Sequence, residues 1–600
     1  MKAKLLLSLL LIGALFQANA QELSSIIKPR LVDIENLSGP DSISSRHPLL
    51  KPNDTNRNIL AAQNLPYPII FIHGLNSNST VWFDMRTALI TKGLSYGGNI
   101  NFCLNFDNNN STANKNIYPE PGADIALFTN PLTELIIGDF YFLNFDVNNV
   151  GDILVSDDGI PFNDVLSNEA SIVKQGIALK YAVQMVLQKT GRDKVILMGH
   201  SMGGLASREY LQNPINWQSD GSHHIAKLIT TGTPHGGYTG TNAALVTGIN
   251  SSSEAYRDLR KEFTYSGSDG TYLYGGIENQ TNIDNSAFSD FYNVDVNCNG
   301  INGDNSMIVG LNDKTWINDL DYSYIVGICT NCDALQGLLY PGDGIVRSEN
   351  ANLSNFTNQL PIPKNEFIYE AAQTGVKGLH SELPQAIPVN FRGLDEPNEY
   401  NLAYEVNFSN TYKGFITVQP SVVGAYPYDF DDYKFLVNSD SQVSVFINNT
   451  FSNPIYARII NSNYLQVGQE LTVNSGSNTL NLNLSVGLYY LEIFTTATNT
   501  SYLYPYTFTL SSTLSNPDFT SSDSLKIYPN PTTSAVFFDN TKLGFTEVQV
   551  FNYLGQEVAR EQLAGASANQ EINISNLSAG VYVLKFHNGT STATAKVVKQ

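Results

Sequence analysis

The chain has 600 residues, which is too many for one hydrophobic core, so its length predicts roughly three or four domains. Hydrophobic residues make up 42% and charged residues 15%, the composition of a folded globular protein and not of a disordered one. The formal net charge of −21 argues against nucleic acid or an anionic membrane surface as the main partner.

The first twenty residues have the pattern of an export signal. Two lysines precede the apolar run Leu5–Phe16, and the stretch 18–20 (ANA) places small residues at a cleavage site. The apolar run is too short to span a bilayer, which takes about 20 residues. We therefore expect a signal peptide at residues 1–20, and no later stretch is long and apolar enough to predict a transmembrane segment.

Changes in residue pattern divide the chain further. Prolines break up the polar residues 21–64, which we expect to form an irregular leader. Residues 65–394 alternate short apolar runs with helical stretches, as is typical of a mostly parallel sheet flanked by helices. Strands are expected at 69–72, 194–198, 227–231 and 324–328, a helix at 168–188, and long inserts near 103–167 and 238–322.

The C-terminal third has a different pattern. Residues 395–513 contain short alternating runs rich in Tyr, Val, Phe and Thr without helical periodicity, which predicts an all-β sandwich. A linker follows at 514–524, and residues 525–600 form a last β-rich unit. The expected fold class is therefore an α/β domain followed by two all-β sandwich domains.

A serine between glycines is the first candidate functional residue. The sequence Gly199-His200-Ser201-Met202-Gly203 follows an apolar strand and precedes a helix-like run. In that context a Gly-x-Ser-x-Gly motif exposes the serine oxygen on a sharp strand-to-helix turn. The glycines remove Cβ atoms that would clash at such a turn. We therefore predict that Ser201 is a nucleophile, which needs a base to take its proton.

Three further stretches carry a family resemblance. Residues 69–77 (IIFIHGLNS) are a strand followed by a His-Gly loop, residues 230–237 read TTGTPHGG, and residues 341–346 read PGDGIV. With the serine motif, and in this order, they resemble the α/β-hydrolase family of secreted lipases and esterases over residues 66–388. The resemblance implies that nucleophile, acid and histidine follow one another along the chain in that order.

This chain order selects the base. Of the eight histidines, only His380 and His587 follow the acid loop, and His587 lies in the terminal unit, so we expect His380 to be the base. The three earlier histidines within motifs are expected to shape their loops by hydrogen bonding, namely His73, His200 and His235.

The acid is expected at Asp343. Glycines on both sides permit a tight turn there before an apolar strand resumes. Other acidic residues in the same part of the chain stay open as rivals: Asp313, Asp319, Asp321, Asp333 and Glu349.

These residues predict acyl transfer through an acyl-enzyme. His380 takes the proton of Ser201, and Asp343 orients the imidazole and stabilises its charged form. The resemblance implies that the backbone N–H groups of Leu75 and Met202 bind the negative oxygen of the intermediate. No metal and no organic cofactor is expected, and activity should fall in acid, where His380 is protonated.

The expected substrate is a carboxylic ester, which makes the chain a lipase or a carboxylesterase. The two inserts are either lids or peripheral caps on the sheet, and the apolar stretch Leu132–Leu143 would suit a lid that faces lipid. One alternative is another acyl bond, in a phospholipid, a thioester or an acylated polysaccharide. A second is a catalytically idle surface adhesion protein, against which the presence of all three catalytic residue types argues.

Two features bear on disulfides and metals. The chain has four cysteines, and an exported protein permits disulfides, but their pairing stays open: Cys103, Cys298, Cys329 and Cys332.

Residues 295–300 (DVNCNG) match the start of a calcium-binding loop, but position twelve is Ser306 where a bidentate Glu is needed. A turn held by Asn and Asp side chains is therefore favoured over a calcium site.

The sandwich resembles the bacterial pre-peptidase C-terminal domain. The resemblance rests on Asp395–Glu399, Asp431–Phe435 and Gly487–Ile493. It implies a module that binds a surface or a polysaccharide, stabilises the enzyme or assists its export.

The last unit resembles the C-terminal sorting domain of the type IX secretion system of Bacteroidota. The stretches 525–532 (LKIYPNPT), 550–556 (VFNYLGQ) and 580–585 (GVYVLK) carry the resemblance. It implies that the type IX machinery is a partner. The protein is then expected to be secreted or anchored at the outer-membrane cell surface.

Overall fold

The computed structural model describes most of the three predicted domains. The described residues are 64–105, 125–148, 167–238, 253–259, 262–265, 268–271, 311–312, 314–328, 342–357, 364–370, 379–417, 429–496, 502–514, 525–542, 544–552, 556–588 and 592–600. The predicted signal peptide, the leader up to residue 63 and the linker from residue 515 lie outside them.

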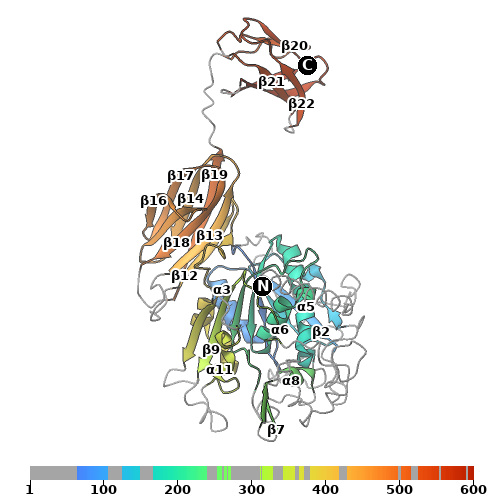
Figure 1. Cartoon of the computed structure of the whole chain (residues 1–600), viewed down its shortest axis with the longest axis vertical. Coiled ribbons are helices and arrows are strands. Elements are labelled where there is room, and N and C mark those ends of the chain that lie inside the picture. Colours follow the sequence, from blue (N-terminus) through green and yellow to red (C-terminus); the bar gives the residue numbers. More distant parts are fainter. Residues whose placement is uncertain are drawn as a thin grey trace, which may run out of the picture. The chain divides into compact units, whose positions relative to one another are not determined.

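The first folded region is built on an eight-stranded sheet (Figure 1). Seven strands are parallel, and β3 is antiparallel to β2 at one edge. This confirms the predicted mostly parallel sheet flanked by helices. In sheet order the strands are β10 (Lys364–Glu370), β9 (Asp321–Ile328), β6 (Ile225–Thr231), β5 (Val195–His200), β1 (Ile69–Ile72), β4 (Phe140–Asn144), β2 (Tyr96–Leu104) and β3 (Ala126–Thr129).

Burial explains why the central strands read as continuous apolar runs. Every residue of β1 and β5 is buried, as expected for parallel strands that helices cover on both faces. The long helix α5 (Ile172–Thr190) begins after Ser171, whose side chain accepts a hydrogen bond from the N–H of Lys174. It ends at Gly191, which adopts a left-handed conformation with φ 67°. Helix α6 (Met202–Gln212) follows β5 directly.

The first predicted insert contains a sheet strand. Phe140–Asn144, which we expected within a possible lid, form β4, with all five residues buried. Strand β4 pairs in parallel with β1, where Ile69 lies opposite Phe140, and with β2 on its other side. An apolar run of this length suits a strand buried on both faces as well as it suits a lid, and only the tertiary pairing decides between them.

Other helices complete this region. They are α3 (Phe83–Thr91), α8 (Glu254–Leu259) in the second insert, α11 (Ser348–Ala351), α12 (Ile387–Gly393) and the short 3-10 helix η8 (His380–Gln385). None of the helices within the described residues is both long and apolar enough to cross a membrane.

The rest of the described chain consists of β-strands, as predicted. One sheet has the order β11-β13-β18-β15-β16, and a second has the order β12-β19-β14-β17. Their strands are β11 (Tyr404–Glu405), β12 (Thr411–Thr417), β13 (Asp429–Val437), β14 (Ser441–Asn449), β15 (Ile455–Asn461), β16 (Gln466–Val473), β17 (Gly476–Leu484), β18 (Gly487–Thr495) and β19 (Tyr502–Leu514).

The terminal unit has its own small core. Its strands form the four-stranded sheet β22-β21-β24-β25 and the pair β20-β23 around a buried apolar cluster. The strands are β20 (Ala535–Phe538), β21 (Glu547–Phe551), β22 (Glu557–Gln562), β23 (Gln570–Asn573), β24 (Gly580–His587) and β25 (Thr592–Lys599).

The α/β region and most of the sandwich belong to one compact unit, and residues 512–600 belong to a second. Within the first unit, the N–H of Glu405 donates a hydrogen bond to the hydroxyl of Tyr67 at 3.0 Å. The rings of Tyr67 and Tyr404 also meet edge to face, with centroids 5.2 Å apart. Polar and aromatic contacts therefore join the sandwich to residues that precede β1.

Candidate active site

The predicted serine turn lies between β5 and α6. Ser201 occupies it with φ 53° and ψ −128°, a conformation that residues with a Cβ avoid. Its N–H donates a hydrogen bond to the carbonyl of Thr231, at the end of the neighbouring strand β6, at 3.0 Å. A Cβ on Gly199 would lie 2.4 Å from the backbone nitrogen of Gly204, so this corner requires glycine.

Asp343 is held as an acceptor. Its side chain is buried, and Oδ1 accepts hydrogen bonds from the N–H groups of Ile345 at 3.0 Å and Val346 at 2.7 Å. Gly344, with φ 90°, makes the tight turn that brings these two donors to the carboxylate. The second oxygen, Oδ2, remains for His380.

His380 connects the acid to the serine. Its Nδ1 donates to Asp343 Oδ2 at 2.8 Å, and its Nε2 lies 2.8 Å from Ser201 Oγ. Because an ionised carboxylate can only accept, the Nδ1 atom carries the ring proton and Nε2 is left to accept from the serine hydroxyl. The backbone N–H of His380 also donates to the carbonyl of Asp343 at 2.9 Å. The structure thus brings the three predicted side chains into one hydrogen-bonded chain.

The rival acids that the structure describes have other partners. Asp319 lies 3.0 Å from His223, Asp321 lies 2.7 Å from Lys227, and Glu349 lies 3.5 Å from Arg347. Asp313 and Asp333 lie outside the described residues. His587, the other late histidine, lies 3.6 Å from Glu547 within the second compact unit.

His235 belongs to a separate buried group. Its Nδ1 accepts from Arg208, 3.3 Å away, so its Nε2 carries the proton and donates to the hydroxyl of Thr230 at 3.0 Å. Burial, together with the nearby guanidinium of Arg208, holds the pKa of His235 well below the ordinary value. His235 is therefore neutral in this arrangement and hydrogen-bonds to Arg208 and Thr230.

His200 supports the candidate base. Its Nε2 donates to the backbone carbonyl of His380 at 2.9 Å, and the two rings lie with centroids 4.8 Å apart. Burial, and next the neighbouring His380, lower the pKa of His200 well below the ordinary value. A neutral His200 lets His380 become charged without a second cation beside it.

Two backbone N–H groups are available near the serine. Met202 is the first residue of α6 and is fully buried, and Leu75 follows the His-Gly loop at the end of β1. Neither backbone N–H meets a hydrogen-bond acceptor among the described residues. Met202 is buried, whereas Leu75 is half-buried, so solvent can reach the residue that carries the second N–H.

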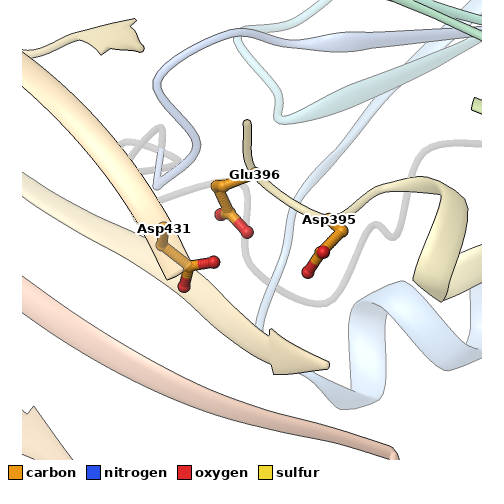
Figure 2. A group of neighbouring side chains, drawn as sticks. All are labelled: Asp395, Glu396 and Asp431. Atoms are coloured by element: carbon orange, nitrogen blue, oxygen red, sulfur yellow. The ribbon is translucent and has the colours of Figure 1, made fainter. Parts of the chain in front are cut away.

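A second buried polar cluster lies where the sandwich meets the α/β region. Asp395 and Glu396 follow α12, Asp431 comes from β13, and one oxygen of each lies within 4.8 Å of the others (Figure 2). Oε2 of Glu396 and Oδ1 of Asp431 have no hydrogen-bond partner among the described residues. Carboxylates placed so closely must share protons or hold a hard cation.

Among the described residues, the carboxylate cluster has more acidic groups than the one nearby ammonium group can neutralise. Burial raises the pKa of Asp395 to about 7 and that of Glu396 to about 8. The ammonium that acts on both is Lys227, which already lies 2.7 Å from Asp321. Asp431 is distant in the sequence from Asp395 and Glu396, so the residue pattern did not predict their proximity. That proximity depends on how β13 packs against the α/β region.

Other predicted features receive little or no structural test. The candidate calcium loop at 295–306, Cys298, Cys329 and Cys332 lie outside the described residues. Cys103 is buried in β2 and packs with Phe128 and Val147.

Comparisons with known proteins agree with this architecture. Residues 174–266 match the family model for lecithin:cholesterol acyltransferase, and residues 526–600 match that for the secretion system C-terminal sorting domain. The chain has an acyltransferase-like α/β-hydrolase domain and a sorting domain. The sorting domain indicates secretion or attachment at the cell surface, and it implies contact with the secretion machinery. Among curated proteins, none matches this chain.

The comparison with solved structures found matches of low sequence identity. A gene product from Listeria innocua is 14% identical with a TM-score of 0.29, and the match covers 56% of this chain and 95% of that chain. A lipase-esterase related protein from Clostridium acetobutylicum is 12% identical with a TM-score of 0.23, covering 56% and 94%. The pre-peptidase C-terminal domain of a collagenase from Bacillus anthracis is 18% identical with a TM-score of 0.16, covering 20% and 99%.

Proposed function

We propose that the chain is a secreted serine hydrolase that cleaves carboxylic esters, as a lipase or a carboxylesterase. The observation that carries the proposal is the hydrogen-bonded chain from Ser201 through His380 to Asp343, with both links at 2.8 Å. In α/β-hydrolases this chain order and this turn are those of an acyl-transfer site. The match of residues 174–266 to an acyltransferase family model supports the same class of reaction.

The first half of the reaction acylates the serine. As Ser201 Oγ attacks the ester carbonyl, Nε2 of His380 takes the hydroxyl proton, and Asp343 stabilises the imidazolium that forms. The tetrahedral intermediate then collapses, the ester C–O bond breaks, and His380 returns the proton to the leaving alcohol. In the second half, His380 activates water, which attacks the acyl-serine and releases the acid.

The developing negative oxygen needs fixed donors. The N–H groups of Met202 and Leu75 are the ones we assign to it, because they have no other acceptor among the described residues. The Met202 donor lies at the amino end of α6, where the helix dipole adds favourable potential. Loss of one such donor costs about 3–4 kcal/mol of transition-state stabilisation.

A matched pair of serine variants tests this proposal. Ser201→Ala removes the proposed nucleophile, whereas Ser207→Ala removes a buried hydroxyl of the following helix α6, which donates to the carbonyl of Gly203 at 2.8 Å. We expect hydrolysis of p-nitrophenyl butyrate to fall about 10⁴-fold or more in the first variant and to stay within a few-fold in the second. Wild-type turnover in a folded Ser201→Ala variant would remove Ser201 from the mechanism.

A substrate panel tests the substrate class. p-Nitrophenyl esters from acetyl to palmitoyl, below and above their solubility limits, separate a carboxylesterase from a lipase, because a lipase gains activity on emulsions. A phospholipid, an acyl thioester and an acetylated polysaccharide test the other acyl bonds. Faster turnover of any of these three than of all simple esters would replace the proposed substrate class while retaining the mechanism.

A further inference from the structure

His73 is a buried histidine that the proposed proton transfers do not use. It directly follows β1, its side chain is fully buried, and its ring meets that of Phe145 with centroids 5.7 Å apart. Both of its ring nitrogens have polar partners. Nδ1 lies 2.8 Å from the carbonyl oxygen of Gly74, and Nε2 lies 2.9 Å from the backbone nitrogen of Phe145.

These partners allow one protonation state of His73. The N–H of Phe145 can only donate, so Nε2 must be an unprotonated acceptor. The carbonyl of Gly74 can only accept, so Nδ1 carries the proton and donates it. Burial lowers the pKa of His73 to about 4, so the ring stays neutral in this tautomer at neutral pH.

The hydrogen bond to Gly74 fixes a peptide group beside the nucleophile. A Cβ on Gly74 would lie 2.6 Å from Cβ and 3.2 Å from Oγ of Ser201, so the backbone of Gly74 lies directly against the serine. The carbonyl of Gly74 and the N–H of Leu75 belong to one peptide unit, which is trans. In a trans peptide these two groups point in opposite directions. A carbonyl held by His73 therefore determines where the N–H of Leu75 points.

We propose that His73 is a positioning residue for the oxyanion hole: it holds the Gly74–Leu75 peptide so that the N–H of Leu75, and not the carbonyl of Gly74, faces the negative oxygen of the intermediate. Phe145, directly after β4, completes the arrangement, because its N–H fixes the ring that fixes the peptide. The oxyanion loop is thus tied to two neighbouring strands, β1 and β4. This inference rests on the proposed acyl transfer at Ser201.

Loss of the hydrogen bond from His73 is expected to raise the energy of the negatively charged intermediate. Without the His73 hydrogen bond, the Gly74–Leu75 peptide can rotate, and a carbonyl dipole directed at the oxyanion would repel it. The effect arises only when the negative charge develops, so it should lower kcat and leave KM nearly unchanged. A purely structural role would instead lower the thermal stability without this separation of kcat from KM.

Two variants of similar length test the inference with p-nitrophenyl butyrate. In His73→Met the side chain cannot make either hydrogen bond, and we expect kcat to fall about 100-fold, comparable to the loss of one oxyanion donor, with KM within threefold. In His73→Gln the amide can donate to Gly74 and accept from Phe145, and we expect kcat within tenfold of the wild type.

His223→Met is the matched control. His223 is also buried and also accepts a backbone N–H, that of Ile225 at 2.9 Å, but it precedes β6 and so lies at the opposite end of that strand from Ser201. We expect it to lower the melting temperature and to leave kcat within twofold per folded molecule. An equal fall of kcat in His223→Met and His73→Met would overturn the proposal.

The remaining outcomes also decide the question. Wild-type kcat in a folded His73→Met variant contradicts the inference. If that variant does not fold, the Gln variant decides, because a loss of more than 100-fold at wild-type melting temperature contradicts it as well. Ser201→Ala distinguishes failure of the proposed function from failure of this inference. Full activity in Ser201→Ala would contradict the proposed function. An inactive Ser201→Ala variant together with wild-type kcat in His73→Met would contradict only the role of His73.

Discussion

The two ends of strand β6 lie near buried carboxylates that differ in how well hydrogen bonds and positive charges compensate them. At its carboxyl end, Thr231 holds the N–H of Ser201, and both oxygens of Asp343 accept hydrogen bonds. Near its amino end, Lys227 is paired with Asp321 and donates to the backbone carbonyl of Asp395, beside carboxylates that keep oxygens without a partner. The carboxylate of Asp343 has hydrogen-bond donors for both oxygens, whereas the group around Asp395 holds more buried carboxylates than ammonium groups.

The difference shows what a buried carboxylate requires. Asp343 has two backbone N–H donors and an imidazole, so its ionised form is solvated by the protein. For Asp429, burial and next the charge of Asp395 raise the pKa well above its ordinary value. Ionisation should therefore be costly at the carboxylate cluster, where burial raises the pKa values of Asp395 and Glu396. Four changes test this comparison.

Asp343→Asn should have the largest effect. The amide can offer its NH₂ group to His380 and so favour the wrong tautomer, and we expect kcat to fall about 10⁴-fold with the fold retained. Kinetics on p-nitrophenyl butyrate and circular dichroism measure the two properties. Asp319→Asn, which changes an acid 3.0 Å from His223, should leave kcat within a few-fold.

Lys227→Met should have the next largest effect, on stability alone. It removes the ammonium that pairs with Asp321 in a site where the two side chains are 0% and 3% exposed, and breaking such a pair costs about 3–5 kcal/mol. Denaturant unfolding measures this loss, and activity per folded molecule should not change. The double variant Lys227→Met/Asp321→Leu should recover part of the loss, and no recovery would argue against the ion pair as its cause.

The carboxylate cluster should make stability depend on pH. Burial raises the pKa of Asp395 to about 7 and of Glu396 to about 8, above the ordinary value near 4 in the unfolded chain. Between about pH 4 and 8 the folded protein therefore binds more protons than the unfolded chain, so the free energy of unfolding should fall as pH rises. Glu396→Gln should flatten this slope.

Urea unfolding between about pH 4 and 9 covers the expected titration and measures the slope. Glu470→Gln, at an exposed position of β16, is the control and should leave the slope unchanged. Parallel series with EDTA and with added CaCl₂ distinguish shared protons from a bound cation, since a cation would stabilise the folded protein at high pH. A stability that rises with pH in both series would contradict the expectation.

The smallest effect is expected for an exposed ion pair. Arg560 is 50% exposed and lies 2.8 Å from Glu557 in the terminal unit. Solvent screens such a pair, so Arg560→Ala should leave the melting temperature unchanged within error. A loss of stability comparable to that of Lys227→Met would mean that burial does not explain the different contributions of the two ion pairs.

Much of the candidate site could be predicted from local sequence. Glycines at the nucleophile turn and beside Asp343 mark places where the backbone must turn tightly, and the order of motifs along the chain selected His380. The stretch Leu132–Leu143 was harder, because an apolar run is compatible with a lid or a buried strand, and it contributes β4 to the sheet. The carboxylate cluster could not be predicted, because no local pattern shows that Asp395 and Asp431 meet.

The sequence by itself determined the parallel sheet, the strand-to-helix serine turn and the terminal sorting domain, since each depends on periodicity or on motifs within a few residues. Only the tertiary structure decided the tautomers of His73 and His380, the partners of the rival acids and the charge imbalance around Asp395. Those features arise from atoms far apart in the chain that packing brings within hydrogen-bond distance, and burial then makes each unmatched charge or donor costly.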